Sequence, residues 1–216
     1  MSHQENMELF QGMLDEGYHC SQCVLGYWAA RMGIDEEAAL RAASGLGMGV
    51  NHGDSCGAVT STAIAIGLAR GFSDGSGSGA VGGVEEMVRA FEEAFAKKNG
   101  SLLCRDLLIG GYDAADPDAA APEGVDPWAN CAMYCADAVK LAEAYLTDAD
   151  LKAVADKIAS SGDSSEGPNL ALVAGGSGAL GIALGALAMA VFTYERRRAQ
   201  NERPGRADGD STARGN

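Results

Sequence analysis

Apolar residues recur every three or four positions along most of the first 160 residues, which is the period of an amphipathic helix. This spacing is found in residues 7–14, 24–32, 38–46, 59–68, 87–95, 132–146 and 151–158. Helix start signals agree with it, because two acids follow Asp35 and acids also follow Thr147. No alternating pattern of the kind that predicts a strand competes with it. We therefore expect an all-α fold, with a helical bundle domain over residues 1–160.

Glycines and polar runs divide the expected helices. Helix ends are predicted at Gly17, Gly33, Gly71 and Gly100. Residues 71–83 are rich in glycine and serine and predict a flexible connection, since the strand and lysine of a nucleotide-binding loop are missing. Residues 113–127 are rich in proline and aspartate and predict an irregular loop.

Residues 170–194 contain no charged side chain and predict a single C-terminal transmembrane helix. A buried core helix is the alternative, although such helices rarely stay uncharged on every face. Residues 161–169 would be a linker, and residues 195–216 a polar, disordered tail. Small residues four apart, at Ser177, Gly181 and Gly185, suit close helix approach and predict a homodimer through this segment, although glycine-rich spans carry such spacing by chance.

The charges around this segment bear on location. The triplet Arg196–Arg198 favours a cytoplasmic C-terminus, which would put the domain outside. The N-terminus lacks a secretory pattern, however, so we expect a single-pass protein of the cell membrane with its domain in the cytoplasm. The net charge of −14 lies mainly before residue 170 and repels phosphate backbones, which argues against a nucleic-acid partner.

Six cysteines carry the candidate chemistry, and each stands at or near an expected helix start. The sharpest signal is Cys56 within residues 53–58, directly before an apolar helix. Unpaired N–H groups and partial positive charge at a helix start stabilise a thiolate, the form that attacks disulfides and binds metals. In a cytoplasm such cysteines are more often catalytic, redox-sensing or metal-binding than structural; in an exported chain they could form three disulfides.

Two pairs of cysteines share a helix face. Cys20 and Cys23 form a C-x-x-C motif typical of dithiol redox proteins, and Cys131 and Cys135 are four residues apart. Two small buried residues would be the plain interpretation of the first pair. Two helices that each offer two sulfurs could also build a four-thiolate site for zinc or an iron–sulfur cluster.

Three further residues are candidates for supporting roles. Arg105 would lower the pKa of Cys104 if its guanidinium turned toward the sulfur, whereas pairing with Asp106 is the ordinary surface outcome. His19 and His52 neighbour Cys20 and Cys56 in sequence and could accept a proton or bind a metal, although a lone histidine near a loop is usually only solvated.

Several segments in order resemble the C_GCAxxG_C_C family, which is named for its cysteine pattern. The resemblance runs from about Tyr18 to Leu146 and rests on residues 18–25, 43–49, 53–59, 104–107 and 131–138. It implies a small, mostly helical bacterial protein that is redox-active and often encoded near transporters. The implied signature sulfurs are Cys20, Cys56, Cys104 and Cys131.

The chain departs from the family pattern in three ways. Ser61 stands where a glycine closes the Cys56 motif, which predicts looser helix packing there. Cys23 and Cys135 are additional, each one helical turn beyond a signature cysteine, and predict extra thiols in the same pocket. The apolar segment 170–194 is also an addition.

Three functions are compatible with these features. The leading hypothesis is a membrane-anchored thiol–disulfide oxidoreductase in which Cys56 or Cys20 attacks and another cysteine resolves the adduct, with a redox protein as partner. The second is a module in which Cys20, Cys56, Cys104 and Cys131 hold an iron–sulfur cluster or zinc without thiol exchange. The third is an accessory subunit of a membrane transporter in which the cysteines act as sensors. A nucleotide, flavin or haem motif is missing, so electrons would come from another protein.

Overall fold

The computed structural model describes residues 1–72, 78–114, 116 and 118–160. The chain divides into two units, Met1–Asn169 and Leu170–Asn216, and only the first contains described residues. The expected linker 161–169, transmembrane helix 170–194 and tail 195–216 therefore lie outside the described part. Within that part, every helix is too short or too polar to cross a bilayer.

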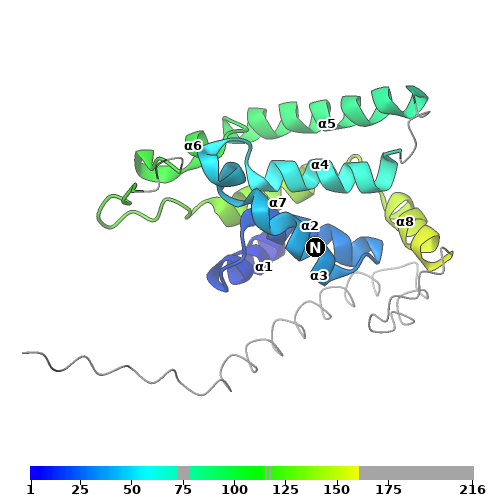
Figure 1. Ribbon diagram of the computed structural model, residues 1–216, viewed down its shortest axis with the longest axis horizontal. Helices are drawn as coiled ribbons and strands as arrows, with labels where there is room; N and C mark the ends of the chain where they lie inside the picture. The colour runs from blue at the N-terminus through cyan, green and yellow to red at the C-terminus, as the bar shows by residue number, and fades with distance from the viewer. Residues whose placement is uncertain (73–77, 115, 117, 161–216) are drawn as a thin grey trace, which may run out of the picture. The chain divides into compact units, whose positions relative to one another are not determined.

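The described residues fold into α-helices and form no strand, which confirms the all-α prediction for this part of the chain (Figure 1). Three short turns of other helical types accompany them, at Ser44–Leu46, Gly49–Gly53 and Ile109–Gly111. The eight α-helices are α1 His3–Asp15, α2 Cys20–Met32, α3 Glu36–Ala43, α4 Gly57–Arg70, α5 Ser78–Asn99, α6 Cys104–Leu107, α7 Cys131–Ala142 and α8 Asp148–Ser160.

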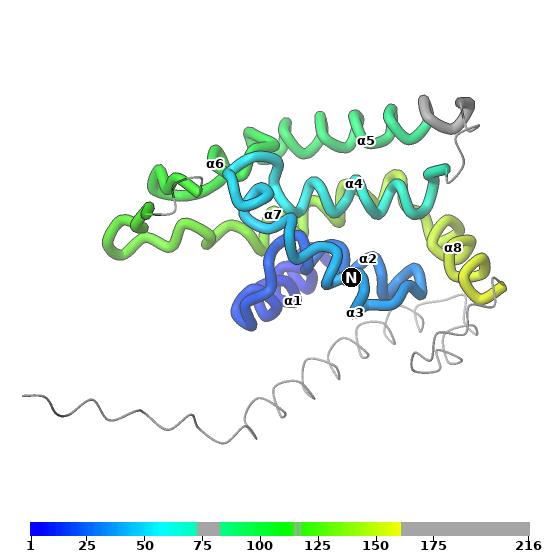
Figure 2. Tube along the Cα trace, viewed as in Figure 1, coloured from blue at the N-terminus to red at the C-terminus, as the bar shows by residue number. Residues whose placement is uncertain are grey.

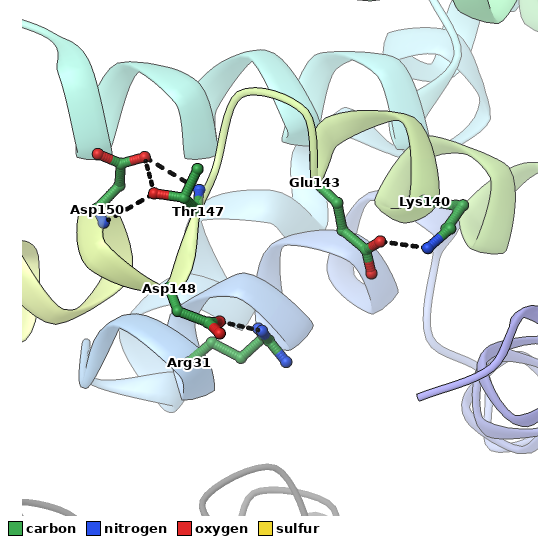
Figure 3. Close-up of polar contacts among 6 residues, drawn as sticks. All are labelled: Arg31, Lys140, Glu143, Thr147, Asp148 and Asp150. Carbon is green, nitrogen blue, oxygen red and sulfur yellow. Dashed lines mark hydrogen bonds and ion pairs between the residues drawn. The ribbon is translucent and has the colours of Figure 1, made fainter. Parts of the chain in front are cut away.

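Local sequence explains where several helices begin. Ser2 and Glu5 form a capping box before α1. Asp35 caps α3, since its Oδ1 accepts a hydrogen bond from the Ala38 amide at 2.8 Å. Thr147 and Asp150 bond reciprocally at the start of α8: the Thr147 hydroxyl donates to Asp150 Oδ2 at 2.7 Å, and the Asp150 amide donates back to Thr147 Oγ1 at 3.4 Å (Figure 3).

Three helices, α2, α4 and α7, contact one another and form the centre of the bundle. The others cover this centre: α1 packs on α7, α3 on α2, and α5 on both α4 and α7, with α4 and α5 side by side (Figure 2). Trp28 and Phe10 are among the largest fully buried side chains. Helix α8 contacts α2 and α4, where Arg31 pairs with Asp148 at 3.2 Å (Figure 3) and Arg70 with Asp150 at 2.8 Å.

Helix boundaries differ from the expected ones in two places. The helix expected over residues 38–46 ends at Ala43, and a 3-10 turn continues the chain to Leu46. The connection expected over residues 71–83 is shorter, because α5 already begins at Ser78. The described residues of 113–127 form turns and irregular chain, as expected.

Candidate functional site

Four cysteines lie at the starts of four helices. Cys20, Cys104 and Cys131 are the first residues of α2, α6 and α7, and Cys56 is the residue directly before α4. All six cysteines are free thiols, and all are buried except Cys131, which is partly exposed. The predicted position of these cysteines at helix starts is thus confirmed. Cys23 and Cys135 lie one turn further along α2 and α7.

A short bridge between two loops holds Cys56 beside Cys104. Ser55 and Leu103 form an isolated antiparallel pair. The Cys56 amide donates to the Leu102 carbonyl at 2.8 Å, and the Cys104 amide donates to the Asp54 carbonyl at 2.7 Å. We call this contact between residues 54–56 and 102–104 the loop bridge. It fixes the starts of α4 and α6 relative to each other.

A left-handed turn precedes the loop bridge. Met48, Val50 and Asn51 have φ values of 53°, 58° and 56°, and Gly49 between them has φ 62°. Such angles are rare for residues with a side chain and rarest for a β-branched valine. A Cβ on Gly49 would lie 2.8 Å from the Cβ of Cys104 and 2.6 Å from the backbone N of Asp54. The turn therefore brings bare backbone against Cys104.

Helices α2 and α4 meet closely at Cys20. A Cβ built on Gly57 would lie 2.7 Å from the Sγ of Cys20, so only glycine leaves space for the sulfur. One turn further, the Ser61 hydroxyl donates to the Ser21 carbonyl at 2.8 Å, and both side chains are fully buried. The prediction of looser packing at Ser61 is wrong, because its hydroxyl fills the contact and bonds across it.

The sulfur of Cys20, a residue of α2, lies against the N-terminus of another helix, α4. A hydrogen bond from the Cys56 thiol is the main cause that lowers the pKa of Cys20 to about 7. The backbone amides of Ser21, Gly57 and Ala58 lower it further, while burial opposes the shift. The free N–H groups at the start of α4 thus stabilise a thiolate on Cys20.

The pKa of Cys56 is shifted in the opposite direction from that of Cys20. Its thiol donates to Cys20, and this hydrogen bond, together with burial and the nearby Cys20 charge, raises the pKa of Cys56 well above its usual range. The sequence predicted that Cys56 would be the thiolate stabilised by its own helix start. This prediction is wrong, because the hydrogen bond that Cys56 donates to Cys20, together with burial, outweighs the Ala58 amide, which lowers the pKa of Cys56.

The other two signature cysteines lie near this pair without a hydrogen bond to it. Burial first, and then the charge of Cys20, raises the pKa of Cys104 to about 11. Burial also raises the pKa of Cys131, followed by the charges of Cys20 and Cys104. The idea that Arg105 lowers the pKa of Cys104 is wrong, because the Arg105 guanidinium pairs with Asp54 at 3.0 Å. Asp106 instead accepts from the Ser101 hydroxyl at 2.7 Å.

Cys23 and Cys135 form a second thiol contact between α2 and α7. A hydrogen bond with Cys23 is the main cause that raises the pKa of Cys135, and burial adds to it. The Cys135 thiol also donates to the backbone carbonyl of Cys20 at 3.7 Å. The extra thiols thus lie next to Cys20 and are more deeply buried than it is.

The two candidate histidines are placed differently. His19 directly precedes α2, where its amide donates to Gln22 Oε1 at 3.0 Å, and its ring occupies the space that a Cβ on Gly47 would need. His52 is exposed in the turn Gly49–Gly53. The ring of His19 therefore has a packing role.

The described residues contain no group of three or more histidine, cysteine or acidic side chains placed to hold a metal ion. Cys20 and Cys56 share a hydrogen bond, while Cys104 and Cys131 interact with Cys20 only through charge. This arrangement does not fit the four-thiolate zinc or iron–sulfur site considered for Cys20, Cys56, Cys104 and Cys131.

Comparison with protein families gives one match, to the family described as "Putative redox-active protein (C_GCAxxG_C_C)", over residues 18–145. The match covers more than half of the chain. The chain belongs to the C_GCAxxG_C_C family. No curated protein and no solved structure gives a significant match. The family region includes all six cysteines and every helix from α2 to α7.

Sequence reasoning named all six cysteines of this C_GCAxxG_C_C protein but missed three features that position them. These are the role of Gly57 as the partner of Cys20, the left-handed turn at Met48–Asn51, and the loop bridge. Gly57 could have been found, because a glycine in the first turn of a helix directly after a cysteine is where a second sulfur can approach the backbone. The loop bridge has no sequence signal, since it is two hydrogen bonds between irregular segments.

Proposed function

We propose that this protein is a thiol–disulfide redox protein in which Cys20 is the nucleophile and Cys56 the resolving cysteine. One observation carries the proposal: the Cys20 sulfur accepts a hydrogen bond from Cys56 and lies on the N-terminus of α4, which lowers its pKa to about 7. A thiol with a pKa near ambient pH combines a large thiolate fraction with high intrinsic nucleophilicity.

The reaction would have two steps. The Cys20 thiolate attacks one sulfur of an oxidised disulfide, so that a mixed disulfide forms on Cys20 and the other substrate sulfur leaves as a thiolate. That thiolate takes the Cys56 proton. Cys56 then attacks Cys20, the Cys20–Cys56 disulfide forms, and the second substrate sulfur leaves as a thiolate, which takes a proton from solvent. Two electrons pass from the dithiol to the substrate, and a partner reductant restores the dithiol.

The proposal includes attachment to the cell membrane through residues 170–194, with the cysteine domain in the cytoplasm and a redox protein or a transporter as partner. It is supported by the uncharged run and the following arginines in the sequence. Membrane fractionation and protease protection of the full chain test this part. Release of the chain by high salt alone, or digestion of the domain from outside intact cells, would contradict it.

The redox chemistry is tested by trapping. The full chain is purified anaerobically, its thiols and metals are counted, and it is treated with oxidised glutathione. Cys56→Ser should accumulate a glutathione adduct on Cys20, because the resolving thiol is gone, while Cys20→Ser should form none there. Wild-type protein should form a Cys20–Cys56 disulfide. Stoichiometric iron or zinc that protects these thiols from glutathione would support the metal-binding module instead.

A further inference from the structure

Cys23 and Cys135 lie outside the signature set, and the fold brings them together. Cys23 projects from α2 and Cys135 from α7, and each thiol is the hydrogen-bond partner of the other. Both residues are 0% exposed. Two thiols in contact across a helix interface can form a disulfide without moving either helix far.

This inner pair is in direct contact with the outer pair of Cys20 and Cys56. The Cys135 thiol donates to the Cys20 carbonyl at 3.7 Å. Cys20 and Cys23 lie one turn apart on α2, so their side chains occupy neighbouring positions on the same helix face. The four sulfurs therefore form a continuous group along the α2, α4 and α7 interfaces.

The inner pair is more deeply buried than the four signature cysteines, of which Cys131 is partly exposed. Cys20 is 9% exposed and Cys56 is 5% exposed, whereas both inner cysteines are completely covered. An external disulfide cannot approach a covered sulfur closely enough for in-line attack. Electrons held by the inner pair therefore leave the folded protein through a less buried cysteine, and Cys20 is the one whose carbonyl the Cys135 thiol contacts.

The geometry points to a second redox site, the Cys23–Cys135 dithiol, which reduces the Cys20–Cys56 disulfide inside the protein. This inference rests on the proposed function, because it needs the outer disulfide as its substrate. With two dithiols, one chain would reduce two substrate disulfides before it needs an outside reductant.

The internal step balances without a further reagent. Cys135 attacks Cys20, the Cys20–Cys56 bond breaks, and Cys56 leaves with the proton that Cys135 gives up. Cys23 then attacks Cys135, the Cys20–Cys135 bond breaks as the Cys23–Cys135 bond forms, Cys20 leaves as a thiolate, and the Cys23 proton is released to solvent. Two electrons move from the inner pair to the outer pair.

Electrostatics favours this direction of transfer. The reduced outer pair is stabilised, because the Cys56 thiol and the amides of α4 hold Cys20 as a thiolate. Burial and the Cys23 contact instead raise the pKa of Cys135. A dithiol with a stabilised thiolate has the more oxidising disulfide, so the outer disulfide is the better electron acceptor.

A single-turnover experiment tests the relay. The reduced full chain receives one equivalent of diamide, is quenched in acid over a time course, and is unfolded and alkylated with N-ethylmaleimide. Disulfides are then mapped by mass spectrometry. Peptide fragmentation is essential, since Cys20 shares a tryptic peptide with Cys23, and Cys131 with Cys135. We expect the Cys20–Cys56 disulfide first and the Cys23–Cys135 disulfide later, with the total constant.

Two outcomes would overturn the relay in different ways. If Cys20–Cys56 forms and persists while Cys23 and Cys135 stay alkylated, the relay is wrong and the proposed function stands. If Cys20–Cys56 forms neither in the wild type nor in Cys135→Ala, the proposed function itself fails, and the relay fails with it.

Variants provide the matched controls. Cys135→Ala should leave Cys20–Cys56 as the stable product, and Cys20→Ser should slow formation of Cys23–Cys135 by at least about tenfold, because the oxidant must then wait for local opening. Formation at the wild-type rate in Cys20→Ser would contradict the relay. Helical circular dichroism of each variant checks that it is folded, and the Cys20→Ser result does not depend on a change in the inner pair.

Discussion

The sulfur of Cys20 lies against the backbone of Gly57, at a place where a Cβ would be only 2.7 Å from it. The same Cβ would be 2.9 Å from the Ser21 amide nitrogen. The contact explains why a helix start in one part of the chain can stabilise a thiolate that belongs to another part.

Gly57→Ala should therefore destabilise the protein by about 1–3 kcal/mol, the usual cost of overpacking, and should displace Cys20 from the α4 amides. Gly67→Ala is the matched control in the same helix, since a Cβ there meets no atom within 4 Å, and alanine should be neutral or stabilising by up to about 1 kcal/mol. Urea denaturation measures both changes. Equal effects at the two positions would show that the close contact is not needed.

The pH dependence of Cys20 reactivity follows from its pKa of about 7. The thiolate reacts and the thiol does not, so iodoacetamide labelling should rise with pH and be half-maximal near that value. Cys56→Ala removes the main cause of the shift, and the midpoint should move upward toward the ordinary value of a cysteine. Fragment-resolved mass spectrometry of the peptide that carries Cys20 measures both profiles. An unchanged midpoint would remove Cys56 as the cause.

Val50 occupies a left-handed conformation with φ 58° and is 50% exposed. Val50→Gly should stabilise the protein by about 1 kcal/mol, because glycine adopts this conformation without the penalty of a β-branched side chain. Val50→Ala is the control: it removes most of the side chain but keeps the Cβ that causes strain, so it should recover only part of the gain. Thermal denaturation measures the difference. A loss of stability in Val50→Gly would mean that the valine side chain itself holds the turn.

Asp137 is a buried acid on α7 whose Oδ1 accepts from His3 Nε2 at 2.6 Å and lies 3.4 Å from Lys98 Nζ. His3→Ala should cost about 1.5–3 kcal/mol, because it removes a hydrogen bond to a buried charged group. Lys98→Ala should cost less, since the contact is longer and the lysine is half exposed. In an Asp137→Asn background the His3→Ala effect should shrink, and a double-mutant cycle of unfolding free energies checks this coupling.

The amphipathic period predicted every described α-helix except the four-residue α6, because the longer helices bury a face within the bundle. Starts such as Asp35 and Thr147 were readable from side-chain caps. The sequence does not show which cysteine has the lowered pKa, because this depends on which thiol accepts the hydrogen bonds. Cys56 directly precedes α4 in sequence, but the fold also brings Cys20 onto the amides of Gly57 and Ala58. The left-handed turn was equally hidden, because Met48 and Val50 adopt a conformation that such side chains disfavour.

The loop bridge also joins the two ends of the antiparallel pair α4 and α5. Its segment 54–56 precedes α4, and its segment 102–104 follows α5. Separating the ends of that helical pair would require breaking both backbone hydrogen bonds beside Cys56 and Cys104. The two hydrogen bonds thus tie the ends of the helical pair together at the place where Cys56 and Cys104 lie.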